Sequence, residues 1–208
     1  MYTYCNQSVY IFLFVCYNVY MGDKLMKNYF IIHGSFGDSN EHYLPWLKKE
    51  LEKEGEVIAV DFPVGKDNQN FENWSKVLDN FKNKINQETI FIGRSIAPIF
   101  IVKYLIKNNL KINKLISISG FNGFINIPDY DYVNKSFLMD SIDNFKEYAN
   151  EIICIYSDND PYVPYYLLDM FARCLANKVK VINGGGHFNA DSGYGEKFEV
   201  VLKYIKEQ

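Results

Sequence analysis

One serine stands at the end of a short apolar run, between neighbours with almost no side chain. Residues 90–92 are Ile-Phe-Ile, and Ser95 has Gly93 two positions before it and Ala97 two positions after it. In a strained strand-to-helix turn the serine backbone is forced into an unfavourable φ/ψ region, where a bulky residue two positions away would clash. The spacing therefore favours a nucleophilic serine. A helix-capping serine in an ordinary turn is the alternative.

A serine hydroxyl is a weak nucleophile at neutral pH, so it needs a base and an acid that orients the base. His187 follows three glycines after the last apolar run of the strand type, and we interpret it as the base. Asp158 and Asp160 follow the apolar run before that one. We favour Asp160 as the orienting acid, because the turn at Pro161 lets it reach the histidine loop. Asp158 is placed to accept backbone N–H bonds.

An acyl-transfer site also needs two N–H donors for the negative oxygen that forms during the reaction. Ile96, directly after the serine, should supply one. Ser35 or Phe36, in the glycine-containing loop at 33–37, could supply the other, and we choose Phe36. His33 should shape this loop by hydrogen bonding. The side chains that we expect to contact substrate are Ser35, Trp46, Phe121 and Tyr162.

Elements that could position these residues alternate along the chain. Near-continuous apolar runs, typical of parallel strands covered on both faces, lie at 29–33, 57–61, 89–92, 114–119, 151–156 and 178–182. Apolar residues at helical spacing separate them, with Asn70 placed as an N-cap. This alternation predicts an α/β fold: a three-layer α/β/α sandwich around a mostly parallel six-stranded sheet. Residues 119–141 form an irregular, aromatic-rich stretch that we expect to act as a small lid or binding loop; a surface excursion packed on its own aromatics is the alternative.

Composition excludes several classes of function. The chain has 208 residues, a net charge of −3 and no basic block, so nothing points to nucleic acid. The histidines form no HxH or HxxxH pair and the four cysteines form no CxxC pair, so we expect no metal site and no disulfide framework. We expect reduced, buried thiols, a cytoplasmic location, no cofactor and a small-molecule ester as the substrate.

The first 25 residues read as an extension, and 26–208 as the catalytic domain. The apolar stretch at 8–20 is short for a bilayer span and lacks the features of a secretory signal. We hypothesise that translation starts at Met26, because codons for Gly22-Asp23 can contain a ribosome-binding sequence. A weak peripheral membrane anchor is the alternative.

From residue 29 onward the chain resembles the small serine hydrolases of the YdeN and retinoblastoma-binding-protein-9 type. The segments that carry the resemblance are 42–47, 93–97, 160–164 and 186–188. It implies a compact α/β-hydrolase with a minimal lid and a triad of Ser95, Asp160 and His187. Two residues depart from the family pattern: Arg94 stands where His is usual, and Ala97 where Gly is usual. We expect Arg94 to pair with a surface carboxylate; an acidic substrate is the other explanation.

These observations favour a serine hydrolase, specifically a carboxylic ester hydrolase of small or medium acyl groups that works through an acyl-serine intermediate. The alternative from another class is a protein-interaction module on a hydrolase scaffold, with weak or vestigial esterase activity and a protein partner. A nucleotide-binding protein is disfavoured, because no GxGxxG follows the first strand.

Overall fold

The computed structural model describes residues 27–207, so the predictions for the N-terminal extension and for Met26 lie outside the described residues. Six strands form one sheet in the order β2-β1-β3-β4-β5-β6, and every neighbouring pair is parallel. The strands are β1 (Asn28–Ile32), β2 (Glu56–Ala59), β3 (Ile90–Arg94), β4 (Ile112–Ile118), β5 (Ala149–Ser157) and β6 (Lys178–Ile182). Each one overlaps an apolar run in the sequence, so the prediction of a six-stranded α/β sandwich is confirmed.

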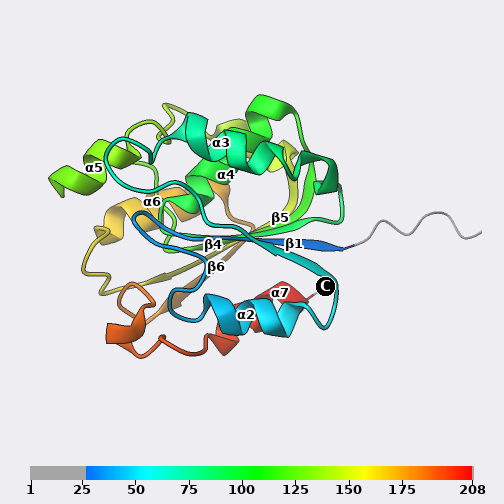
Figure 1. Cartoon of the computed structure of the whole chain (residues 1–208). Helices are drawn as coiled ribbons and strands as arrows, with labels where there is room; N and C mark the ends of the chain where they lie inside the picture. Colours follow the sequence, from blue (N-terminus) through cyan, green and yellow to red (C-terminus); the bar gives the residue numbers. More distant parts are fainter. Residues whose placement is uncertain (1–26, 208) are drawn as a thin grey trace, which may run out of the picture.

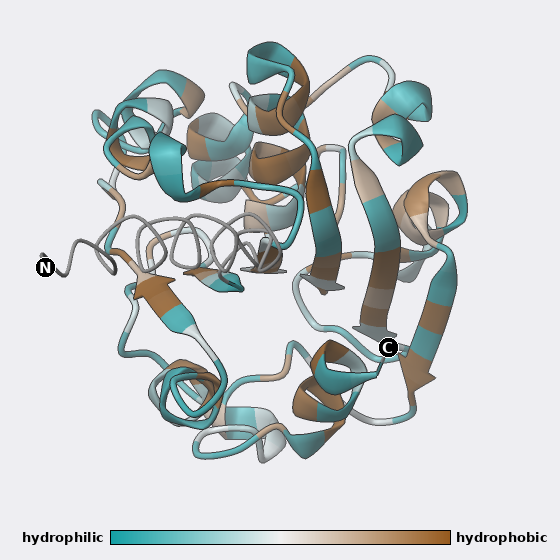
Figure 2. Cartoon of the chain, turned by 90° about the vertical axis from the view of Figure 1, so that its right-hand side faces the viewer, coloured by the Kyte–Doolittle hydropathy of each residue, from teal (hydrophilic) through white to brown (hydrophobic). Residues whose placement is uncertain are grey.

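Helices cover both faces of the sheet and give the molecule three layers (Figure 1). On one face lie α3 (Phe71–Asp79), α4 (Ala97–Asn108) and α6 (Tyr165–Leu175); on the other lie α2 (Leu44–Leu51) and α7 (Glu199–Lys206). Each face has its own hydrophobic core. Figure 2 shows the hydrophobic residues gathered in the strands and in the helix turns that face them.

Helix α4 follows the candidate nucleophile directly and is the most deeply buried helix. Both α3 and α6 lie on the same face of the sheet, and residues 97–102 of α4 are all buried. The first half of α4 is apolar on all sides and is enclosed by other elements, so it fixes the C-terminal end of β3 firmly. Asn109 ends the helix in the left-handed conformation, with φ of 51°.

Helix α3 begins where the sequence predicts, because the Asn70 side chain accepts a hydrogen bond from the Asn73 N–H. The apolar spacing continues to Ile85, but α3 ends at Asp79 and a short 3₁₀ turn, Lys82–Lys84, follows. Two further 3₁₀ turns span Asp143–Glu147 and Ala190–Ser192.

The irregular stretch at 119–141 contains one short helix, α5 (Pro128–Asn134). Pro128 occupies its first turn, where a missing N–H costs nothing. The α5 helix stands at the end of the molecule where the parallel strands finish, and it projects over that edge (Figure 1). Because ligands of open α/β sheets bind at the carboxyl ends of the strands, α5 is placed to form one wall of a site.

Candidate active site

Ser95 lies in the turn between β3 and α4, in a backbone conformation that non-glycine residues rarely adopt. Its φ is 60°, and its N–H donates to the carbonyl of Ile118 over 2.8 Å. A Cβ on Gly93 would lie 2.8 Å from Cδ1 of Ile101 and 3.0 Å from the Pro98 nitrogen, so a side chain there would collide with α4. The turn therefore requires glycine at 93, and it stores strain of the kind found at functional sites.

His187 and Asp160 meet across two loops. Nδ1 of His187 is 2.7 Å from Oδ2 of Asp160, and the aspartate side chain is fully buried. The other carboxylate oxygen, Oδ1, accepts the N–H groups of Tyr162 and Val163 at 2.9 and 3.0 Å. Burial alone would raise the pKa of Asp160, but the hydrogen bond and charge of His187, together with these N–H groups, outweigh it and lower that pKa.

The imidazole of His187 is also buried, with 6% of the residue exposed. Burial lowers its pKa, because the charged form loses water, and Arg94 acts in the same direction; the bond to Asp160 opposes them in part. The net direction is downward, so the ring is neutral at pH 7. With Nδ1–H donated to Asp160, Nε2 is left as a proton acceptor.

The glycines before His187 are held by the segment that follows β5. Three consecutive N–H groups are accepted in turn: that of Gly184 by Asp158, that of Gly185 by Ser157 and that of Gly186 by Asn159, all over 2.8 to 2.9 Å. Gly184 and Gly186 have positive φ angles of 72° and 55°. Asp158 thus fixes the loop that carries His187, whereas Asp160 contacts the imidazole itself.

The loop after β1 lies directly over Ser95. A Cβ on Gly34 would be 2.9 Å from the Cβ of Ser95. His33 is fully buried and joins this loop to the chain after β2: its Nε2 accepts the Phe62 N–H over 2.9 Å, while Nδ1 lies 2.8 Å from the Gly34 carbonyl. His33 therefore shapes the loop, and both of its ring nitrogens are engaged.

The Phe36 N–H, expected to be an oxyanion donor, is already engaged. It donates to Oε1 of Gln69 over 3.0 Å, and Phe36 has a φ of 59°. Gln69 in turn donates to Oδ1 of Asn134 on α5, which also accepts the Ser35 hydroxyl over 2.7 Å. Gln69 and Asn134 are each only 2% exposed. Within residues 27–207, the N–H groups of Ser35 and Ile96 have no hydrogen-bond partner.

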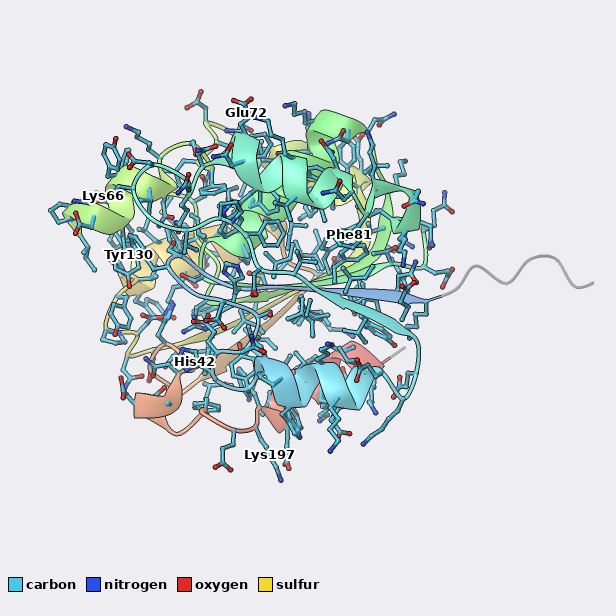
Figure 3. The ribbon with its side chains drawn as sticks, viewed as in Figure 1. His42, Lys66, Glu72, Phe81, Tyr130 and Lys197 are labelled. Atoms are coloured by element: carbon cyan, nitrogen blue, oxygen red, sulfur yellow. The ribbon has the colours of Figure 1, made fainter. Side chains whose placement is uncertain are left out.

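A pocket of about 290 Å³ opens at these groups and contains both Ser95 and His187. One part of its wall is aromatic or aliphatic and consists of Phe36, Ile125, Tyr130, Tyr162 and Val163. The remainder is polar and consists of Ser35, Glu41, His42, Arg94, Asn189 and Asp191. In Figure 3, Tyr130 and His42 lie at the same end of the molecule, on opposite sides of the sheet edge.

The sequence model of the family described as serine hydrolase matches residues 29–207. The chain belongs to the serine hydrolase family. It is 25% identical over 196 residues to the putative hydrolase YdeN of Bacillus subtilis, covering 88% of this chain and 99% of that protein. The crystal structure of the B. subtilis ydeN gene product superposes with a TM-score of 0.75 at 25% identity, covering 87% of this chain and 100% of that one. This serine hydrolase is a YdeN-like α/β-hydrolase.

More distant structures share its fold. Est1E from Butyrivibrio proteoclasticus, solved with ferulic acid bound, superposes with a TM-score of 0.66 at 16% identity, over 90% of this chain and 91% of that one. Mouse α/β-hydrolase domain-containing protein 10 gives a TM-score of 0.63 at 15% identity, over 86% and 88%. At these identities the likeness concerns the arrangement of the elements alone.

Two of the four expected substrate contacts are placed elsewhere in this serine hydrolase. Ser35 and Tyr162 line the pocket, but Trp46 and Phe121 do not. Trp46 is on α2 and packs against the core between α2, α7 and the sheet. Phe121 is 1% exposed and belongs to the core on the other face. Both aromatic residues pack in the hydrophobic cores and lie outside the pocket lining. Cys174, expected to be buried, is exposed, whereas Cys154 is buried.

Arg94 has partners that the sequence did not indicate. Nη1 is 3.0 Å from Oε1 of Glu41, and Nη2 donates to the carbonyl of His187 over 3.3 Å. Arg94 does pair with a carboxylate, but we expected that carboxylate on the open surface. It lies on the pocket wall instead. Gln69 and Asn134 were missed as well, because an isolated amide in a loop or short helix carries no motif.

No group of three or more His, Cys, Asp or Glu side chains in residues 27–207 could hold a metal ion. No helix in the described part of the chain is long and apolar enough to cross a membrane.

Proposed function

We propose that this serine hydrolase cleaves carboxylic esters with small or medium acyl groups through an acyl-serine intermediate. The observation that carries the proposal is the 2.7 Å contact between His187 and Asp160 in the pocket that also holds Ser95 in its strained turn. The pocket volume, about 290 Å³, lies at the lower end of the range for small-molecule sites and favours compact substrates.

The first half-reaction transfers the acyl group to the enzyme. Nε2 of His187 takes the proton of the Ser95 hydroxyl as Oγ attacks the ester carbonyl carbon. Asp160 keeps Nδ1 protonated and stabilises the imidazolium that forms. When the tetrahedral intermediate collapses, the C–O bond to the alcohol breaks, and His187 returns the proton to the departing oxygen. Water then repeats the sequence and releases the acid.

Two N–H groups stabilise the oxyanion in this scheme. The Ile96 N–H is the first, as the sequence predicts. For the second we now propose the Ser35 N–H in place of Phe36, because the Phe36 N–H is donated to Gln69 and the Ser35 N–H has no partner among residues 27–207. Gly34, which lies against Ser95, lets that backbone approach the reacting carbonyl.

A panel of p-nitrophenyl esters from acetate to dodecanoate tests the proposal. Wild-type protein should hydrolyse the short and medium esters, and Ser95→Ala should lower kcat/KM by about 10⁴-fold or more. Ser141→Ala, at an exposed serine, is the matched control and should behave as wild type. Wild-type turnover no faster than that of Ser95→Ala on every ester would favour the interaction-module alternative.

A further inference from the structure

Arg94 joins three segments of chain that meet at the active site. The residue ends β3 next to Ser95, and its guanidinium contacts Glu41 from the loop before α2 and the backbone of His187 from the loop after β6. Its side chain is 7% exposed and that of Glu41 is 19% exposed. A buried arginine that lost its carboxylate would be an uncompensated charge, so the contact is under strong constraint.

The loop before α2 is shaped to receive the Glu41 carboxylate. A Cβ on Gly37 would lie 2.6 to 2.7 Å from the three carboxylate atoms, so the glycine leaves the space that they occupy. The backbone of Glu41 is held by a turn, because its carbonyl accepts the Leu44 N–H over 3.1 Å as α2 begins. The carboxylate therefore lies against Gly37 and is largely enclosed, with 19% of the side chain exposed.

We propose that Arg94 and Glu41 form a positioning pair that fixes the backbone of His187 beside Ser95. The inference rests on the proposed role of His187 as the base. Asp160 holds the imidazole at Nδ1, and Arg94 holds the carbonyl of the same residue. The histidine is thereby fixed at the ring and at the main chain. The planar fork of arginine can reach both Glu41 and the carbonyl, whereas one ammonium group has no fixed fork.

The two charges of the pair act on the His187 imidazole in opposite directions. Arg94 lowers the pKa of His187 and Glu41 raises it. Asp160 and His42 also interact electrostatically with the ring, Asp191 lines the same pocket, and Tyr162 packs edge-on at 5.3 Å between ring centroids. A pair of opposite charges thus holds the backbone without adding net charge beside the base.

The competing explanation is that Arg94 binds an anionic group of the substrate. The charge of Arg94 is already matched by Glu41. The Nε atom of Arg94 has no partner among residues 27–207, but it is buried and therefore not open to a ligand. The two explanations differ in what they predict for neutral substrates, which makes them separable by kinetics.

The experiment measures kcat and KM from pH 5 to 9 on a neutral ester and on one that carries a carboxylate. Arg94→Lys keeps the charge and loses the fork, so kcat should fall about tenfold to a hundredfold on both esters, since small displacements of a catalytic group have costs of this size. Glu41→Gln keeps the shape and loses one charge, so the acidic limb of kcat/KM should move to lower pH. Arg94→Met removes the positive charge that lowers the pKa of His187, so the acidic limb of kcat/KM should move to higher pH.

Arg173→Gln is the matched control, because Arg173 forms an exposed pair with Asp169 on α6, and its profile should match wild type. Melting temperatures check that each variant is folded. Wild-type kcat in Arg94→Lys, limbs that move the same way in the two charge variants, or a loss confined to KM for the charged ester would overturn the inference. Labelling of wild type by a fluorophosphonate tests the proposed function separately, so failure of one is distinguishable from failure of the other.

Discussion

At the scale of single residues, the candidate site depends on the protonation states of His187 and Asp160, which their surroundings determine. His187 is buried, so its neutral form is favoured, and Asp160 is buried but held ionised by His187 and two N–H groups. A neutral imidazole beside an ionised carboxylate is the resting state that a general base requires.

The first prediction concerns the pH dependence of turnover. The pKa of His187 is lowered from the ordinary value of 6.5, so the neutral, active form persists to lower pH than for an exposed histidine. We expect kcat/KM to rise with a midpoint below 6.5 and to be level by pH 7. Stopped-flow hydrolysis of a neutral ester measures this, and a midpoint above 7 would contradict the assignment.

The second prediction separates the two aspartates. Asp160→Asn should lower kcat by about 10³- to 10⁴-fold, because the amide can hold the imidazole in the wrong tautomer. Asp158→Asn is the matched control two residues away; it perturbs only the bond to Gly184 and should lower kcat by less than about tenfold. Equal losses in the two variants would mean that the loop, and not the tautomer, limits the rate.

At the scale of elements, the site is assembled from loops that meet at the carboxyl ends of parallel strands. The sequence predicts those strands because a strand covered on both faces is an apolar run, and it locates Ser95 and His187 because each follows such a run beside glycine. It does not locate Glu41, Gln69 or Asn134. Their roles depend on the paths of the loops that carry them, and hydrogen bonds between distant loops leave no periodic pattern.

The third prediction tests the amide contacts of the loop after β1. Gln69→Leu removes the acceptor of the Phe36 N–H and the donor to Asn134, and leaves buried polar groups unpaired. We expect a loss of about 1–3 kcal/mol in the free energy of unfolding and a fall in kcat of about tenfold or more, as the Ser35 N–H shifts. Urea unfolding and ester kinetics measure the two effects.

The control for this experiment is Asn68→Leu, at the exposed neighbouring residue, which should change both quantities little. If Gln69→Leu lost stability and kept wild-type kcat, the amide contacts would be structural alone, and Ser35 would lose its support as an oxyanion donor.

At the scale of the whole molecule, two hydrophobic cores pack against the two faces of the sheet and hold it rigid. The loops at the strand ends are therefore held in defined positions. The core on the α3, α4 and α6 face contains a group of edge-on and tilted rings around Phe100, which is fully buried and contacts Trp74 and Phe137 edge-on. Because α4 starts directly after the turn that holds Ser95, packing of this core also determines the position of Ser95.

The fourth prediction follows from that packing. Phe100→Ala should lower the free energy of unfolding by about 3–5 kcal/mol, through lost burial and the cavity that remains. Tyr166→Ala, at a residue 55% exposed on α6, should change it by less than about 0.5 kcal/mol. Equilibrium urea unfolding followed by circular dichroism gives both values, and similar losses in the two variants would argue against the described packing.

Peptide mass spectrometry after reaction with a fluorophosphonate, applied to wild type and to Ser95→Ala, tests whether Ser95 is the nucleophile. We expect a single phosphonyl adduct on Ser95 in wild type, formed more slowly in His187→Ala and absent in Ser95→Ala. An adduct on another residue, or equal labelling of wild type and Ser95→Ala, would contradict the assignment of Ser95 as the nucleophile.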